Sequence, residues 1–130
     1  MSCEAIWEEE GMRVVVVGDM DDGYIDLRRA TGKDPRLIKM KYICIDLSAA
    51  EKFSISANTM KQLAVMDSKA YDSNPNMVVA MVTNELVMAG LMNLYRVHFE
   101  LNNQDKTWET RLFDSEPEAR AWIKSKTATS

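Results

Sequence analysis

Several residue types that mark specialised protein classes are scarce in this sequence. Its 130 residues include two cysteines, three prolines, five glycines and one histidine. Two cysteines are too few for a disulfide scaffold, and a single histidine excludes a metal site built from several histidines. None of the patterns G-x-x-x-x-G-K, G-x-G-x-x-G and G-x-S-x-G occurs. Nucleotide binding and hydrolysis by a catalytic triad therefore lose their main support.

Charge and hydropathy exclude further classes. Sixteen basic residues against twenty acidic ones give a net charge of -4, which argues against a nucleic-acid or anionic-membrane partner. No apolar run approaches the roughly 20 residues that span a bilayer. The segment Met1 to Glu10 is acidic, unlike a signal peptide. We expect a soluble, cytoplasmic single domain over residues 1–130, without internal repeats and with a frayed tail over 124–130.

The densest apolar runs predict the centre of a β-sheet. Their continuous hydrophobicity is typical of strands covered on both faces, and they cover Met12–Val17, Tyr42–Leu47 and Met77–Val82. Ala5–Glu8, followed by a turn ending at Gly11, predicts an antiparallel hairpin with the first run. Trp108–Phe113 mixes charged and apolar residues, as an edge strand does.

Helical patterns fill the segments between these strands. Ser56 predicts the start of a helix that ends near Asp72–Pro75, and a second helix is expected over 84–102. Ser115, with Pro117 and Glu118 after it, starts a third. Asp21–Thr31 favours a helix over a hairpin. The predicted fold is α/β: a mixed, mostly parallel five-stranded sheet with an N-terminal antiparallel hairpin and about four helices.

Residues suited to catalysis or metal binding are few. His98 falls beside Leu91, Leu94 and Leu101 on a helical wheel, which favours a packed histidine over a general base. Asp46 is predicted to end a central strand, and together with His98 it makes the only plausible catalytic pair. We expect no catalytic residue, no metal and no cofactor.

Three other features concern charge or cysteine. Cys3 and Cys44 lack close-spaced metal-binding neighbours, and Cys44 is expected in the core. The Asp19–Gly23 segment does not have the spacing of an EF-hand, so its acids favour a helix start. Asp67 replaces an expected apolar residue, which favours exposure of this side chain over contact with a nearby cation. A basic run is interpreted as a solvated face, and it is also the favoured electrostatic docking surface; it comprises Arg28, Arg29, Lys33, Arg36, Lys39 and Lys41.

The predicted helix over 84–102 carries more apolar residues than one packing surface needs. Only a narrow side, including Asn93 and Arg96, is polar or small. The excess must contact another helix, a partner subunit or a ligand. Unbranched methionines suit adaptable contacts, so we assign a partner or ligand surface to this helix and the strand before it: Met81, Met88, Met92, Tyr95 and Phe99. Packing against the C-terminal helix is an equal alternative.

The segment Ile43–Ala57 resembles part of the STAS domains, the sulfate-transporter and anti-sigma-factor antagonist family. In that family a hydrophobic strand ends in Asp-Leu, as Asp46-Leu47 does here, and an Asp-Ser-Ser-Gly motif opens the next helix. Ser54–Ala57 occupies the position of that motif, and only its second serine remains, at Ser56. The order of elements over nearly the whole chain resembles the SpoIIAA-like branch, which is anti-sigma-factor antagonist-like.

This resemblance implies a non-enzymatic regulatory module that docks a protein partner. It also implies that a kinase can phosphorylate Ser56, with Ser54 and Asp46 in the same docking region; the alternative is that Ser56 only caps a helix. Our main hypothesis is a self-associating interaction module that uses the Met-rich helix and the loop around Ser56. The second is a carrier that holds an apolar, lipid-like molecule between helix 84–102 and the sheet.

Overall fold

The structure, a computed structural model, describes residues 1–84, 87–88, 90 and 108–128. The elements are β1 (Ser2–Trp7), β2 (Gly11–Met20), α1 (Tyr24–Gly32), the 3-10 helix η1 (Pro35–Lys39), β3 (Tyr42–Phe53), α2 (Ala57–Ser73), β4 (Val78–Val82), β5 (Glu109–Phe113) and α4 (Glu116–Thr127). The strands form one five-stranded sheet in the order β1-β2-β3-β4-β5. Only β1 and β2 pair antiparallel, and the other neighbours pair parallel, which confirms the predicted fold.

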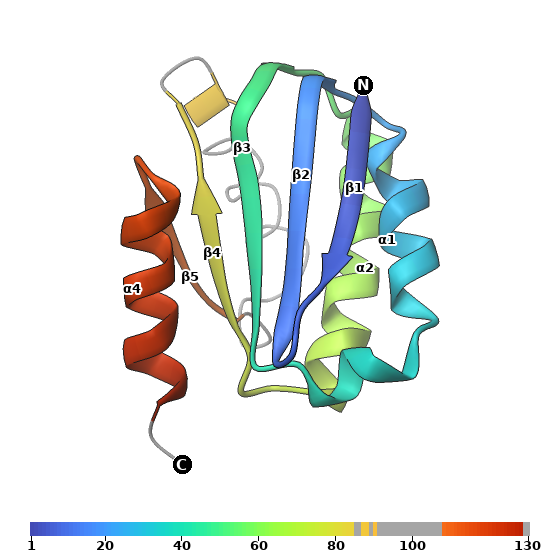
Figure 1. Cartoon of the computed structure of the whole chain (residues 1–130). Helices are drawn as coiled ribbons and strands as arrows, with labels where there is room; N and C mark the ends of the chain where they lie inside the picture. The colour runs from blue at the N-terminus through green and yellow to red at the C-terminus, as the bar shows by residue number, and fades with distance from the viewer. Residues whose placement is uncertain (85–86, 89, 91–107, 129–130) are drawn as a thin grey trace.

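Helices cover the two faces of the sheet unequally (Figure 1). On the first face, α1 and α2 pack over a core that includes Met12, Val14 and Leu63. On the second face, α4 packs over β3, β4 and β5 through a smaller core that includes Trp122. Within the part of the chain that the structure describes, no helix covers the second face of β1 and β2, which we call the open face, and Val17 there is 47% exposed.

The apolar run of β3 lies at the centre of the sheet because the strand is covered on both faces. Alternate residues of β3 point to opposite faces, so Ile43 belongs to the first core and Cys44 to the second. Both faces of β3 are therefore buried from Tyr42 to Leu47, as the continuous hydrophobic run predicts. The predicted edge strand is also confirmed, since β5 ends the sheet beside β4.

The strands β1, β2 and β3 are longer than predicted, and the largest difference lies at the end of β3. The sequence predicts that the third strand ends at Leu47 with a loop after it, whereas β3 continues to Phe53. The reason is its neighbour: β2 runs to Met20 and pairs with β3 as far as Phe53, across two irregularities in the register. Asp46 therefore lies inside a strand and does not end it.

The helices also differ from the prediction at several points. The described residues contain three α-helices, where about four were expected, and the predicted helix over 84–102 lies mostly outside them. Its start is described: the Asn84 side chain accepts a hydrogen bond from the Val87 N–H at 3.1 Å. The sequence did not predict η1, which Asp34 caps through the Arg36 N–H. The helical alternative for Asp21–Thr31 is confirmed by α1.

The C-terminal helix is longer than expected. A frayed tail was predicted from Lys124, but α4 continues to Thr127, and the Ala128 N–H donates to the Lys124 carbonyl at 3.0 Å. The predicted start is confirmed, because the Ser115 side chain accepts a hydrogen bond from the Glu118 N–H. None of the helices in the described part of the chain is long and apolar enough to span a membrane.

Gly11 provides a test of the β2–β3 pairing. A Cβ at Gly11 would lie 2.6 Å from both the ring and the backbone carbonyl of Tyr42, and a rotamer change relieves only the first contact. We expect Gly11→Ala to lower the free energy of unfolding by about 1–3 kcal/mol in urea titrations. The control is Gly32→Ala, since a Cβ there meets nothing within 4 Å and alanine favours the helix. Equal stability of the two variants would contradict this packing.

Candidate functional site

Among the predicted site residues, Asp46 is a buried one with several hydrogen-bond partners. It lies on the second face of β3 and is 8% exposed. Its carboxylate accepts hydrogen bonds from Arg13 at 2.9 Å, from the Ser48 N–H at 3.0 Å and from the Ser48 hydroxyl at 2.6 Å. Burial raises the pKa of Asp46, but the hydrogen bonds from Ser48 and Arg13 outweigh this effect and hold it below its ordinary value. Asp46 is therefore an ionised anchor at neutral pH.

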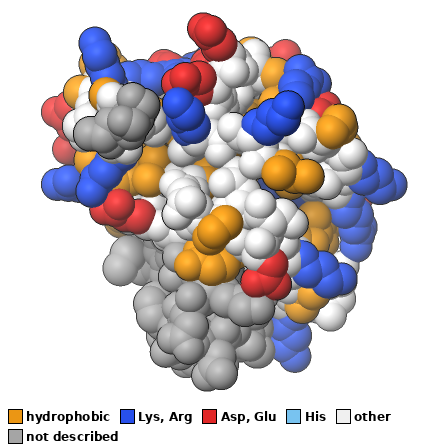
Figure 2. Space-filling model, turned by 90° about the horizontal axis from the view of Figure 1, so that it is seen from below, with side chains coloured by type: hydrophobic (Ala, Val, Ile, Leu, Met, Phe, Trp, Pro, Cys, Tyr) orange, Lys and Arg blue, Asp and Glu red, His pale blue; other side chains and the backbone are white. Residues whose placement is uncertain are grey.

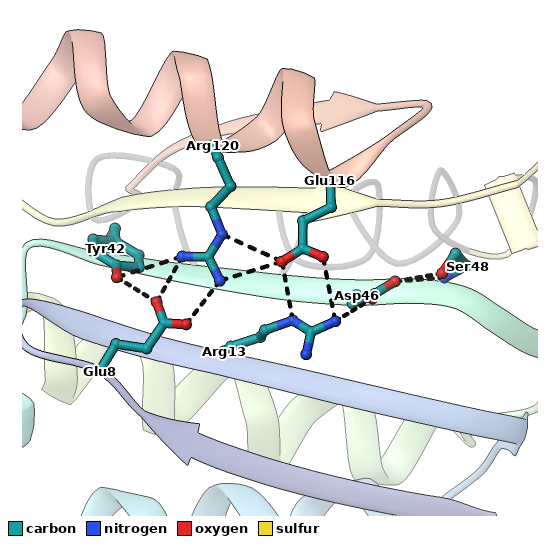
Figure 3. A network of polar contacts seen from close by, with 7 residues as sticks. All are labelled: Glu8, Arg13, Tyr42, Asp46, Ser48, Glu116 and Arg120. Atoms are coloured by element: carbon teal, nitrogen blue, oxygen red, sulfur yellow. Dashed lines mark hydrogen bonds and ion pairs between the residues drawn. The ribbon is translucent and has the colours of Figure 1, made fainter.

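The contacts of Asp46 continue into a polar network across the second face (Figure 3). Arg13, in β2, also contacts Glu116 at the start of α4, with an Nε–Oε1 distance of 3.2 Å. Glu116 in turn contacts Arg120, which donates to both carboxylate oxygens of Glu8 at 2.6 and 2.8 Å. The network therefore ties α4 to β2, β3 and the turn after β1.

The titratable groups in and beside this network are poorly suited to proton transfer or nucleophilic attack. The hydrogen bond from Arg120 lowers the pKa of Glu8, which keeps that carboxylate ionised. Burial and the hydrogen bond to Glu8 raise the pKa of Tyr42 to about 12. Burial raises the pKa of the Cys44 thiol to about 11, so its nucleophilic thiolate is scarce at neutral pH. These groups hold the structure together instead of offering reactive side chains.

Ser56 caps α2, as the sequence predicts. Its side chain accepts a hydrogen bond from the Thr59 N–H at 3.3 Å. Its hydroxyl donates to one carboxylate oxygen of Asp22 at 2.9 Å, and its N–H donates to the other at 2.7 Å. These two hydrogen bonds lower the pKa of Asp22. Ser54 is also exposed, and its N–H donates to the Met20 carbonyl at 2.9 Å.

The hydrogen bond from Ser56 to Asp22 affects how well the site can hold a phosphate on Ser56. A phosphate on Ser56 would replace the proton that the hydroxyl donates to Asp22, and it would place two negative groups side by side. The exposed hydroxyl is accessible to a kinase, but Asp22 must move away afterwards. The local electrostatics therefore favour the capping role.

The residues predicted for one docking region do not lie together. Among the described contacts, Asp46 is bonded to Arg13 and Ser48, whereas Ser56 is bonded to Asp22 and Thr59. Asp46 faces α4, while Ser56 starts α2 on the first face.

Only part of the predicted Met-rich surface is described. Met81 in β4 is half-buried and packs against the first core, and Met88 is a half-buried helical residue. Met92, Tyr95, Phe99 and also His98 lie outside the described residues. In the described part of the chain, no group of three or more His, Cys, Asp or Glu side chains is arranged to hold a metal ion.

A cavity that the sequence did not predict lies between α1, η1 and α2 at one end of the sheet. Its volume is about 770 Å³, and its apolar lining includes Met12, Met66, Met77 and Trp108. The basic run supplies part of its rim, through Arg28, Arg29 and Lys33. That run was the available signal, but the sequence could not show that α2 adds Lys61 and Lys69 opposite it.

Asp67 lies behind this rim. The preferred expectation of exposure was wrong: its carboxylate contacts the Arg28 guanidinium, and the two side chains are only 24% and 18% exposed. The stated alternative, a nearby cation, is confirmed. Without Arg28, a half-buried carboxylate on this side of α2 would be costly.

Comparison with solved structures assigns the fold. An uncharacterized protein of the DUF3478 family from Shewanella loihica PV-4, described as having a SpoIIAA-like fold, superposes with a TM-score of 0.56. The match covers 94% of this chain and 92% of that one at 12% sequence identity. The chain has a SpoIIAA-like fold. No family model matches the sequence, and no curated protein matches it either.

The Asp46 network predicts a specific loss of stability in acid. Because the pKa of Asp46 is lowered in the folded state, its contribution is present above the unfolded pKa and is lost as pH falls through the folded pKa. At pH 7, Asp46→Asn should lower the free energy of unfolding by about 1–2 kcal/mol and should weaken its decline below about pH 5. Asp26→Asn is the control, because Asp26 is 80% exposed. An Asp46→Asn protein as stable as wild type at neutral pH would refute this account.

The Ser56–Asp22 contact predicts a charge effect that capping alone does not produce. Asp and Asn are equally good N-caps, so Ser56→Asp and Ser56→Asn should differ only through the added charge beside Asp22. We expect the Asp variant to melt at a lower temperature than the Asn variant in low salt. The difference should disappear when Asp22→Asn is added; if it persists there, Asp22 is not the cause.

Proposed function

We propose that this chain is a non-enzymatic, STAS-like interaction module that docks protein partners and associates with a second copy of itself. The fold supports such a module in general terms. The polar network adds support, because the pKa values of Glu8 and Asp46 are lowered by their partners while those of Cys44 and Tyr42 are raised. A partner-binding role needs none of these groups to react.

The open part of the second face supplies the surface for a protein partner. Because α4 packs mainly over β3, β4 and β5, no helix among the described residues covers most of the β1 and β2 side chains on that face. Ile6 and Val17 are 37% and 47% exposed there, next to the exposed Glu4 and the half-buried Arg13. Apolar side chains bordered by charges of both signs are typical of protein–protein interfaces.

The observation that supports self-association is the edge of β1, which pairs with no strand other than β2 among the described residues. The Glu8 N–H bonds to the Gly11 carbonyl, and antiparallel pairing alternates, so Cys3, Ala5 and Trp7 direct their backbone groups away from β2. The strand contains no lysine or proline and pairs with β2 in an uninterrupted register. Natural edges usually carry one of these protections against pairing.

The sequence of β1 also selects a register. If Ala5 pairs with the partner's Ala5, each Glu4 lies beside an Ile6, and no like charges are opposed. A register centred on Glu4 would place two carboxylates opposite each other. The favoured pairing joins the two sheets into one continuous sheet with both open faces on the same side.

Proline at position 5 tests this interface. Ala5→Pro removes an outward N–H but leaves the hydrogen bonds to β2 intact, which edge strands tolerate. Light scattering after size exclusion should report a dimer for wild type and a monomer for Ala5→Pro, with similar circular dichroism. Val17→Lys, which changes the open face but not the edge, should remain a dimer. A monomeric wild type or a dimeric Ala5→Pro protein would overturn the proposed self-association.

The cavity favours a second candidate function, the binding of a small molecule with an apolar part. A volume of about 770 Å³ falls in the range of about 300–1,000 Å³ that is common for single-ligand sites. The location differs from the one predicted from the sequence, since the cavity lies between α1, η1 and α2.

A further inference from the structure

The floor of the cavity is apolar because its polar groups are already paired. The Trp108 indole N–H donates to the Asn74 carbonyl at 2.8 Å. The Asn74 amide donates in turn to the carbonyls of Leu37 and Met40 at 3.1 and 2.7 Å. The remaining lining includes Met12 and Met77, which are 1% and 3% exposed. This floor therefore offers a ligand apolar contacts and few hydrogen bonds.

The rim has the opposite character. Of the described residues that line the cavity, five are basic and one, Asp34, is acidic, although the whole chain has a net charge of -4. Asp34 is paired with Arg36 at 2.7 Å, so it does not neutralise the rim. The view onto this end of the molecule shows Lys and Arg side chains beside exposed hydrophobic ones (Figure 2).

Two of the five basic residues are already engaged by the protein. Arg28 contacts Asp67, and Arg29 donates to the Gln62 side chain at 2.6 Å. The three others, Lys33, Lys61 and Lys69, are exposed and have no ion pair among the described residues. They lie on the two sides of the cavity, at the end of α1 and along α2.

We propose that this cavity binds one single-chain alkyl carboxylate, with the chain on the apolar floor and the carboxylate among Lys33, Lys61 and Lys69. The inference rests on the small-molecule candidate above and adds the class of ligand. A neutral apolar molecule would fill the floor but leave three lysines without a counter-charge. A small inorganic anion would meet the lysines but leave the apolar lining in contact with water. A single-chain carboxylate satisfies both parts of the lining.

Calorimetric titration of the full chain with decanoate and decanol tests the proposal, because the two probes differ mainly in head-group charge. We expect decanoate to bind on the order of tenfold more tightly than decanol, and this difference in affinity should shrink as salt is added. Exchanging all three rim lysines (Lys33→Gln, Lys61→Gln, Lys69→Gln) should bring decanoate down to the affinity of decanol, while decanol binding stays unchanged.

A matched variant controls for net charge. Lys39, Lys52 and Lys124 are exposed and do not line the cavity, so exchanging them for glutamine removes the same charge elsewhere and should leave both affinities unchanged. Equal binding of decanoate and decanol to wild type would overturn the carboxylate assignment and keep the small-molecule candidate. The same assignment fails if both triple variants weaken decanoate equally. Failure of both probes to bind would remove the candidate function together with the inference.

Discussion

The parallel pairing of β2 with β3 is the constraint on which the other features depend. It is extended at both ends, where the Lys41 N–H donates to the Glu10 carbonyl at 2.7 Å and the Ser54 N–H donates to the Met20 carbonyl at 2.9 Å. One end of this ladder fixes the turn that carries Glu8, and the other brings the start of α2 next to Asp22. Through β3, it also sets Asp46 opposite Arg13 on the second face. A slip of one residue would exchange the two faces and remove all of these contacts.

Because the ladder fixes both faces, the different coverage of each face accounts for the two proposed functions. On the first face, α1 and α2 leave a cavity at the end of the sheet where η1 crosses. On the second face, α4 packs over β3, β4 and β5. Its Glu116 and Arg120 also form ion pairs with Arg13 in β2 and with Glu8 in the turn after β1.

The sequence was sufficient for most of the described strands and helices, with η1 as an exception, and it was insufficient for the sites. Continuous apolar runs, together with Ser56 and Ser115, encode strands and helix starts locally, so those predictions were confirmed. The true end of β3 depends on the length of β2, and the exposure of Asp67 depends on Arg28, 39 residues earlier. The cavity likewise needs three separate elements. Such properties come from pairings between distant segments, which residue periodicity does not contain.

The two proposed binding sites are joined by a short chain of contacts. Trp7, in the free edge strand, lies under the Arg36 guanidinium, 4.1 Å from the ring centroid, and Arg36 is paired with Asp34 on the cavity rim. An anion bound among the rim lysines would attract Arg36 and weaken its ion pair with Asp34. Pairing of β1 with a second copy would restrict the motion of Trp7. Any coupling between the two events must be reciprocal, so a ligand that strengthens the dimer must itself bind the dimer more tightly.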